Sequence, residues 1–509
     1  MKIKLKNQLI SLKKLRAVWK GAVQVSLGRD ARRRIAESNE LINEIIAAGD
    51  SVYGVNTGFG ILARIHIKDA ELVHLQENLV RSHSVGVGSD LDDDTVRLAM
   101  LLKVIALAEG FSGVRLELVE ALCALINSEV YPRIPCKGSV GASGDLAPLA
   151  HMASLLIGEG EARVNGEIVS AQAALAHAGI EPLKLAPKEG LALLNGTQVS
   201  TALALAAVFR TENVLAAALV AGAMSADAMQ ASDTPFDRRI HNVRGHGGQI
   251  AVATMLRELM RSSEIRASHI ECDRVQDPYS VRCQPQVIGA CLDVLRHVCS
   301  TLEIEANAVT DNPLVFADTS AVLSGGNFHA EPVAFAADYL ALAIAEIGAI
   351  SERRTALLID PHMSSLPAVL IEDSGLKSGF MLVQVTAAAL ASENKSLAHP
   401  ASVDSLPTSL NQEDHVSMAT FAARRLHEML DNTQLIIAIE LLAAAQGIEF
   451  HHPKKSSAAL ESVITKLRKV SPRYTDDRAL SADISEVAAL IGSGEFCEHA
   501  SSVLPAQSS

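Results

Sequence analysis

The chain of 509 residues carries 45 basic and 58 acidic side chains, which give a net charge of −13. Its residues are 49% hydrophobic, 20% charged and only 3% aromatic, which is typical of a globular protein with more than one aliphatic core. The acidic balance argues against a nucleic-acid-binding or anionic-membrane-binding surface, because both need clustered Lys and Arg.

The sequence also gives no clear sign of a secretory signal or a membrane-spanning segment. The basic N-terminal stretch "MKIKLKNQLISLKKLRAVWK" lacks the apolar run of a secretory signal. Charged residues interrupt the long apolar stretches, Arg210 and Glu212 in one and Asp338 and Glu346 in another. We therefore expect that no segment is long enough to span a bilayer. We also expect a cytoplasmic protein. The seven cysteines include no CxxC pair, so we expect reduced and mostly buried thiols.

The first part of the chain is predicted to mix helices with loops and one hairpin. "MKIKL" (1–5) is a candidate edge strand. Residues 92–110 and 114–130 place apolar side chains at three- and four-residue spacing, which predicts two helices. "EARVNGEIV" (161–169) predicts a β-hairpin, because Asn165-Gly166 suits the positive φ angles of a type I′ turn.

Helical patterns rich in alanine follow one another from about residue 200. Many are apolar nearly all round, and small Ala side chains let helix axes approach closely. We therefore predict a mainly α fold in which an N-terminal sub-domain (1–200), rich in loops and carrying the small β-hairpin, precedes a long helical bundle (201–509) that forms the oligomer core. The predicted helices of this second part are 201–231, 286–303, 331–356, 380–397 and 416–446.

The stretch "KGSVGASGDLAPL" (137–149) is unusually rich in small residues. It lacks the lysine of a Walker loop, the spacing and flanking strand of a dinucleotide fingerprint, and the last glycine of a nucleophile elbow. A plain glycine turn and a place for backbone chemistry both remain open. Elsewhere, His329-Ala-Glu331 resembles half of a zinc deaminase signature, but no PCxxC follows and HExxH is absent, so no metal site is predicted.

Backbone chemistry is possible at Ala142-Ser143-Gly144. Attack of the Gly144 amide nitrogen on the Ala142 carbonyl carbon would close a five-membered ring, and loss of water would turn the Ser143 side chain into an exocyclic methylene. Glycine offers an unhindered nitrogen and unusual backbone angles, alanine an uncrowded carbonyl, and serine the oxygen that leaves. Asp145 could assist the proton transfers or cap the following helix.

In these residues the sequence resembles the aromatic amino acid ammonia-lyases, which build 4-methylidene-imidazol-5-one (MIO) from Ala-Ser-Gly. "GSVGASGDLAPLAH" is similar to the family's signature, and the other shared motifs fall in the family's order over most of residues 50–420. They are "YGVNTGFG" (53–60), "LLNGTQ" (193–198), "QDPYSVRCQPQV" (276–287), "DNPLVF" (311–316), "GGNFHAEP" (325–332) and "NQEDHVSM" (411–418).

The resemblance implies a role for each matching side chain. Tyr53 would be the base that removes the β-proton of the substrate, and Arg282 would clamp the substrate carboxylate with a bidentate guanidinium. Asn195 would hold the MIO oxygen, much as an oxyanion hole does. The remaining matches would orient substrate and MIO, in the case of Gln276 and Tyr279, or form an aromatic wall near MIO, in the case of Phe328.

Substrate choice depends on Ser82-His83, a pair that resembles the selectivity position of the histidine-type members. Tyrosine-type relatives carry His-Leu there and phenylalanine-type relatives carry Phe-Leu. A polar pair suits an imidazole, which can both donate and accept hydrogen bonds. Glu413 could accept from the imidazole N–H, and Met381 matches the apolar position that lines the ring.

The resemblance therefore implies non-oxidative deamination of L-histidine to trans-urocanate and ammonia, the first step of histidine breakdown. It also implies a homotetramer whose active sites combine loops from three subunits, with self-made MIO and no external cofactor or metal. The alternatives are a tyrosine or phenylalanine ammonia-lyase, an MIO aminomutase that returns the ammonia to the β-carbon, and an inactive helical scaffold. The signature of the helical fumarase and aspartase enzymes, GSSxMPxKxN, is absent.

Overall fold

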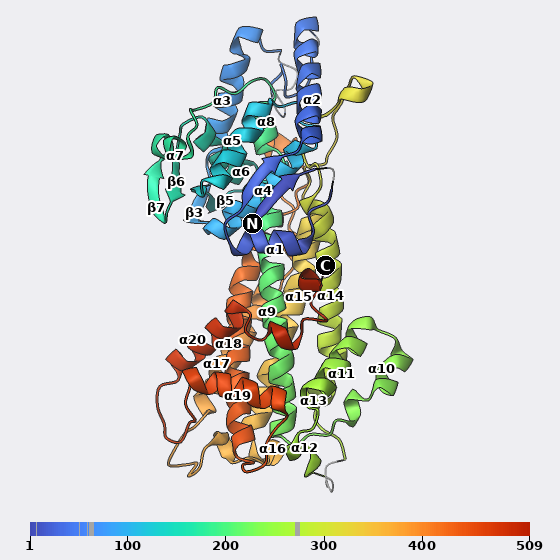
Figure 1. The fold of residues 1–509 in the computed structure, drawn as a ribbon, viewed down its shortest axis with the longest axis vertical. Helices are drawn as coiled ribbons and strands as arrows, with labels where there is room; N and C mark the ends of the chain where they lie inside the picture. Colours follow the sequence, from blue (N-terminus) through green and yellow to red (C-terminus); the bar gives the residue numbers. More distant parts are fainter. Residues whose placement is uncertain (7, 50, 59, 61–65, 270–274, 509) are drawn as a thin grey trace. The chain divides into compact units, whose positions relative to one another are not determined.

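The structure is a computed structural model of residues 1–509, and it describes all of them except 7, 50, 59, 61–65, 270–274 and 509. The described elements are mostly helices joined by loops and a few short strands (Figure 1). The predicted mainly α fold class is confirmed.

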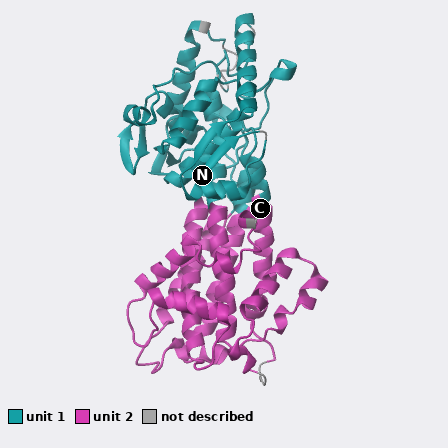
Figure 2. Cartoon of the chain, viewed as in Figure 1, with its two compact units in different colours: residues 1–206, 300–338, 400–424 teal, residues 207–299, 339–399, 425–509 magenta. Residues whose placement is uncertain are grey.

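Two compact units make up the chain, and they differ from the linear division at residue 200 (Figure 2). Unit 1 contains residues 1–206, 300–338 and 400–424, and unit 2 contains residues 207–299, 339–399 and 425–509. A single cut cannot separate them, because four long helices contribute residues to both units. These helices are α9 (Gln198–Ala228), α14 (Gln284–Ala306), α15 (Glu331–Ile359) and α18 (Ala419–Glu449).

Unit 1 combines short helices with four small sheets. Its helices are α1 (Leu12–Lys20), α2 (Arg29–Ala48), α3 (Leu72–His83), α4 (Asp93–Ala108), α5 (Leu116–Asn127), α6 (Leu146–Leu156), α7 (Ala171–Ala178) and α8 (Glu189–Leu194), with 3-10 turns η2 (Asp69–Glu71), η4 (Ala317–Thr319) and η6 (Ser409–Asn411). Its strands are β1 (Lys2–Leu5), β2 (Gln24–Leu27), β3 (Val87–Asp90), β4 (Val130–Pro132), β5 (Pro135–Lys137), β6 (Glu161–Val164), β7 (Glu167–Ser170), β8 (Leu314–Phe316) and β9 (Ala321–Leu323).

The strands expected near the N-terminus and at the hairpin are both present. β1 pairs in parallel with β2, with Lys2 opposite Gln24. β6 and β7 form the predicted antiparallel hairpin, and Asn165 (φ 52°) and Gly166 (φ 81°) occupy the turn with positive φ. The β3–β5 and β8–β9 pairs had no clear signal in the sequence, because each strand is only three or four residues long.

Helix α4 shows why the predicted helices form where they do. The Asp92 carboxylate accepts a hydrogen bond from the Thr95 amide (2.7 Å), and Asp93 and Asp94 add negative charge to the first turn. Beyond that turn the helix is buried on all sides, including its one lysine, Lys103. The other predicted helices are also confirmed, with ends within three residues of the observed ones for the long helices α9, α14, α15 and α18.

The elements of unit 2 among the described residues are helices joined by loops. Besides its share of the four long helices it contains α10 (Arg238–Arg244), α11 (Gly247–Leu259), α12 (Glu264–Ala267), α13 (Tyr279–Arg282), α16 (Pro361–Ser364), α17 (Met381–Leu397), α19 (Ala458–Val470), α20 (Ser481–Ser493) and α21 (Pro505–Ser508), with 3-10 turns η3 (Thr234–Phe236), η5 (Ala368–Leu370) and η7 (Cys497–His499).

A buried ion pair ties three of the long helices together inside unit 2. The Arg354 guanidinium of α15 contacts the Glu440 carboxylate of α18 through Nε (2.5 Å) and Nη2 (2.8 Å). Ser225 of α9 and Ser351 of α15 each donate to the same carboxylate, at 2.6 Å. Removing either charged partner would leave the other charged and buried, which is far more costly than keeping the pair.

Two helices of the described chain, α9 and α15, are long and apolar enough to cross a bilayer, contrary to the expectation from sequence. The charges noted in these stretches do not interrupt the helices. The most apolar window of α9 is 94% buried and that of α15 is 67% buried, as in core helices.

The six described cysteines are free thiols, as expected, and four of them are buried. Burial raises the pKa of Cys123 and of Cys291 to about 12, so both thiols stay protonated at neutral pH. Cys272 lies outside the described residues.

Candidate active site

A cavity of about 900 Å³ in unit 1 brings together most of the predicted site residues. We call it the Ser143 cavity. Loops and helix ends from five separate stretches of unit 1 form its wall. The predicted residues that line it are Tyr53, Ser82, His83, Ala142, Ser143, Asn195, Phe328 and Glu413.

The Ala142-Ser143-Gly144 tripeptide lies in the tight connection between β5 and α6. Gly144 has a φ of +72°, and a Cβ atom there would lie 2.1 Å from the carbonyl oxygen of Gly196. The next amide, that of Asp145, donates to the same oxygen at 2.7 Å. The 196 segment therefore holds the tripeptide from one side, and no residue larger than glycine fits at position 144.

The Asp145 carboxylate does not cap α6, so that alternative from the sequence is wrong. The side chain turns instead toward the start of α9, where it accepts from the amide (2.7 Å) and hydroxyl (2.9 Å) of Ser200. Thr420 Oγ1 (2.6 Å) and Ser139 Oγ (3.2 Å) also donate to it. The first-turn amides of a long helix are strong donors without helical partners, which explains this choice. Burial raises the pKa of Asp145, and these hydrogen bonds oppose that rise.

The Asn195 side chain keeps unused hydrogen-bonding capacity beside the tripeptide. The residue follows the last turn of α8 and is 5% exposed, and its Oδ1 has no hydrogen-bond partner among the described residues. Rotation of the amide exchanges its donor and acceptor ends. A buried polar group of this kind needs a partner, and the carbonyl oxygen of MIO would supply one. The unpartnered amide and the steric requirement at Gly144 both fit formation of MIO here.

The predicted selectivity residues Ser82 and His83 also line the cavity, at the end of α3. Nδ1 of His83 lies 2.8 Å from the carbonyl oxygen of Leu79 and 3.0 Å from Oγ of Ser82. Burial lowers the pKa of His83, although the Leu79 hydrogen bond and the nearby Glu413 carboxylate raise it. A largely neutral imidazole held through Nδ1 leaves its other nitrogen for a ligand.

Glu413 is held in place by its own loop and contacts the tripeptide directly. Thr408 Oγ1 and Ser409 Oγ each donate to its Oε2 at 2.7 Å. Its Oε1 accepts from the Ser143 hydroxyl at 2.8 Å. The sequence predicted Glu413 as an acceptor for the substrate, but it did not predict this contact with Ser143.

The two aromatic residues predicted for the cavity are both half-buried in its wall. The Tyr53 hydroxyl accepts a hydrogen bond of 3.3 Å from the Gly60 amide. Phe328 lies just before the start of α15. Phe59, which belongs to the same sequence motif as Tyr53, lies outside the described residues.

The remaining predicted residues belong to unit 2, and none of them lines the Ser143 cavity. Gln276 and Arg282 line a cavity of about 680 Å³ there. The Arg282 guanidinium lies 4.6 Å from the centre of the Tyr279 ring, and its buried Nε has no hydrogen-bond partner among the described residues. Tyr279 is 72% exposed, and Met381, the first residue of α17, is 48% exposed.

Two histidines of the Ser143 cavity were not predicted as site residues. The rings of His329 and His415 are stacked with their centres 5.9 Å apart, and His329 Nε2 lies 3.2 Å from the backbone oxygen of His415. Both lie in shared motifs, and their place in those motifs was the available signal. Among the described residues no group of three or more His, Cys, Asp or Glu side chains could hold a metal ion.

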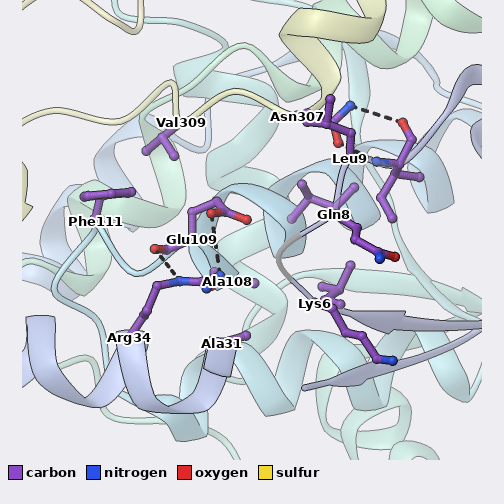
Figure 3. Close-up of a pocket in the computed structure, with 13 residues that line it drawn as sticks. Lys6, Gln8, Leu9, Ala31, Arg34, Ala108, Glu109, Phe111, Asn307 and Val309 are labelled. Atoms are coloured by element: carbon purple, nitrogen blue, oxygen red, sulfur yellow. Dashed lines mark hydrogen bonds and ion pairs between the residues drawn. The ribbon is translucent and has the colours of Figure 1, made fainter. Parts of the chain in front are cut away.

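A smaller cavity of about 310 Å³ in unit 1 does not compete as a functional site (Figure 3). Arg34, a half-buried cation in its lining, donates to the backbone oxygens of Glu109 (3.1 Å) and Ala108 (3.2 Å), at the end of α4. Asn307 pairs with the backbone of Ile10 through both ends of its amide, at 2.8 and 3.1 Å. The Arg34 and Asn307 side chains already have backbone partners, so we interpret this cavity as a feature of the packing.

Comparison with known proteins agrees with this geometry. The model of the family described as aromatic amino acid lyase matches residues 10–469. A protein of Vibrio cholerae serotype O1 named histidine ammonia-lyase is 58% identical over 483 residues, 95% of this chain and 94% of that protein.

Solved structures are similar over nearly the whole chain. The crystal structure of histidine ammonia-lyase from Trypanosoma cruzi has a TM-score of 0.91 and 41% identity, and covers 99% of this chain and 96% of that one. The tyrosine aminomutase from Streptomyces globisporus has a TM-score of 0.92 and 35% identity, with 99% of each chain covered. The chain therefore belongs to the aromatic amino acid lyase family.

Proposed function

We propose that the protein is a carbon–nitrogen lyase that converts L-histidine to trans-urocanate and ammonia, through an MIO group made from Ala142-Ser143-Gly144. The observation that carries this proposal is the common cavity: the tripeptide, the polar pair Ser82-His83 and the Glu413 carboxylate all line it. The identity to relatives named histidine ammonia-lyase supports the same substrate.

MIO would supply one capacity that ordinary side chains lack, an electrophilic methylene carbon that turns an amine into a better leaving group. Formation of the ring removes the Ser143 hydroxyl. The Oε1 atom of Glu413, which accepts from that hydroxyl, then becomes free while Oε2 stays held by Thr408 and Ser409. Glu413 is thus a fixed acceptor for the N–H of a substrate imidazole.

The other residues act on the substrate and on the oxygen of the ring. Tyr53 removes the proton from the β-carbon, and ammonia leaves from the α-carbon as the double bond forms. Asn195 donates its amide to the MIO oxygen. Arg282 binds the substrate carboxylate through a bidentate pair, with Gln276, Tyr279, Phe328 and Met381 shaping the rest of the site.

We expect the complete site to draw on more than one copy of the chain. Arg282 and Gln276 do not line the Ser143 cavity of their own chain, and Arg282 carries a buried nitrogen without a partner among the described residues. A homotetramer could bring Arg282 and Gln276 of one subunit to the Ser143 cavity of another, and this would complete the site. The cytoplasmic location and the absence of an external cofactor or metal remain predictions from the sequence.

The substrate can be tested by incubating the purified protein separately with L-histidine, L-tyrosine and L-phenylalanine. Ultraviolet absorbance follows the conjugated product, and chromatography identifies it. We expect urocanate from L-histidine and little product from the other two. Coumarate or cinnamate as the main product, or a β-amino acid in place of urocanate, would overturn the proposal in favour of a tyrosine or phenylalanine lyase or an aminomutase.

A further inference from the structure

Lys103 is a charged side chain in the middle of the otherwise apolar part of α4, and it is only 1% exposed. Its Nζ donates to the backbone oxygen of Ala192 at 3.1 Å and to that of Asn195 at 2.6 Å. Both oxygens lie at the end of α8, where carbonyl groups have no partner within the helix. The ammonium therefore closes the C-terminal end of α8.

The corner of backbone that Lys103 holds is the one that supports the tripeptide. The side chain of Asn195 lines the Ser143 cavity, and the next carbonyl, that of Gly196, accepts from the Asp145 amide. Gly196 also pairs with Gly144 as an isolated bridge. Lys103 thus reaches the tripeptide through two consecutive residues without contacting the cavity itself.

Burial of this lysine is costly, which makes a purely structural role a poor explanation. The pKa of Lys103 is lowered to about 7, mainly by burial and also by nearby Lys188, while Asp311 and Asp145 act to raise it. Lys188 is itself paired with Asp311 at 2.8 Å, so the Asp311 carboxylate does not belong to Lys103 alone. An apolar side chain in α4 would avoid the cost of a buried charge, provided nothing depended on the two carbonyl groups.

We propose that Lys103 is a positioning residue for the electrophile: by holding the carbonyl groups of Ala192 and Asn195, it fixes the Asn195 amide and Gly196 against Ala142-Ser143-Gly144. This inference rests on the proposed function of the tripeptide. Small displacements of a group that stabilises a reacting centre reduce turnover more than binding, so the effect falls on kcat.

The test compares Lys103→Met and Lys103→Gln with a control, Lys188→Met. The control also removes a buried ammonium and leaves Asp311 unpaired, but Lys188 donates to neither Ala192 nor Asn195. For each variant we would measure the melting temperature, the intact mass, and kcat and KM for L-histidine. The fraction of chains lighter by two water molecules, one lost when the ring closes and one lost from the Ser143 side chain, reports ring formation without any substrate, and kcat is expressed per chain that has formed the ring.

We expect Lys103→Met to lower this kcat by about 10- to 100-fold with a much smaller change in KM. Lys188→Met should lose at least as much thermal stability but keep kcat within about threefold. If Lys103→Met does not fold, the kcat of Lys103→Gln, which can still donate to one carbonyl, provides the test. A folded Lys103 variant with the kcat of the wild type, or an equal loss of kcat in Lys188→Met, would overturn the inference. Failure of the wild type to act on L-histidine would instead overturn the proposed function, and the mass readout separates the two.

Discussion

Ser143 is the residue at which sequence and structure contribute most differently. The small neighbours of Ser143 and the family motifs predict its chemistry. The structure adds that the Ser143 hydroxyl donates to Glu413 and that the Asp145 amide donates to the Gly196 carbonyl. Neither contact can be derived from spacing, because Ser143 and Glu413 lie 270 residues apart. Side chains brought together by a fold over such a distance leave no periodic signal.

Replacement of Ser143 by alanine should abolish most of the activity and leave the fold intact. Alanine has no oxygen to lose, so the methylene cannot form, and among the described residues the side-chain hydrogen bond removed is the half-buried one to Glu413. We expect kcat for L-histidine to fall by about 10³-fold or more, with a melting temperature close to that of the wild type. Near-normal turnover by this variant would rule out the MIO mechanism.

Lys103 should make the stability of the protein depend on pH in a defined direction. Its pKa is about 7 in the folded chain and near 10.5 in an unfolded one. Between these values the unfolded chain binds more protons, so the free energy of unfolding of the wild type rises with pH relative to that of Lys103→Met. The charges that face Lys103, those of Lys188, Asp311 and Asp145, are the same in both proteins.

Chemical denaturation at pH 6 and pH 9 would measure this effect. We expect the destabilisation caused by Lys103→Met to be larger at pH 9 than at pH 6, by about 2–3 kcal/mol. Equal destabilisation at the two pH values would mean that the buried lysine keeps an ordinary pKa.

Whole elements were easier to predict than the connections between them. Apolar periodicity and the acidic first turn located α4, and Asn165-Gly166 located the β6–β7 hairpin. The short helix α8 gave no such signal, since its six residues are too few for a period to emerge. Asn195 and Gly196 follow directly after this helix. The helix that positions them was therefore the part of the site that the sequence predicted least well. Lys103 is the one charged residue in the apolar stretch 98–108 of α4, and this position is visible in the sequence.

The connection between β5 and α6 should tolerate no side chain at Gly144. The Gly144→Ala variant would place a Cβ 2.1 Å from the Gly196 oxygen in a residue with positive φ. We expect loss of ring formation, seen as an intact mass that lacks the two-water deficit, together with loss of activity.

Gly166→Ala in the β6–β7 turn is a matched control for that substitution. Gly166 also has a positive φ, of 81°, but nothing lies within 4 Å of a Cβ there. The control should lose about 1 kcal/mol of stability and keep full activity. Ring formation in Gly144→Ala at the level of this control would show that the turn is less constrained than its geometry indicates.

The sequence predicted two regions and an active site shared between subunits. It did not predict that each compact unit is built from three separate segments. The compact units include later segments in unit 1 because long helices contribute to both units, and no composition change marks those points. Ser143 belongs to unit 1 and Arg282 to unit 2. The site shared between subunits remains a prediction.

A shared site predicts that two inactive variants rescue each other. Ser143→Ala and Arg282→Met should each be inactive alone. If Ser143 and Arg282 of one site come from different subunits, co-expressed mixed oligomers contain intact sites, and roughly a quarter of the sites should be active. Mixing the purified variants without subunit exchange is the control and should give none. No activity in verified mixed oligomers would place both residues of each site on one chain.

The mass of one tryptic peptide shows whether this chain makes its own electrophile. Trypsin cleavage after Lys137 and Arg163 releases residues 138–163, which contain the tripeptide and no other cleavage site. For the wild-type protein we predict a peptide lighter than its sequence by two water molecules, with the loss confined to residues 142–144 by fragmentation. A peptide of unmodified mass from a preparation that converts L-histidine to urocanate would contradict the account.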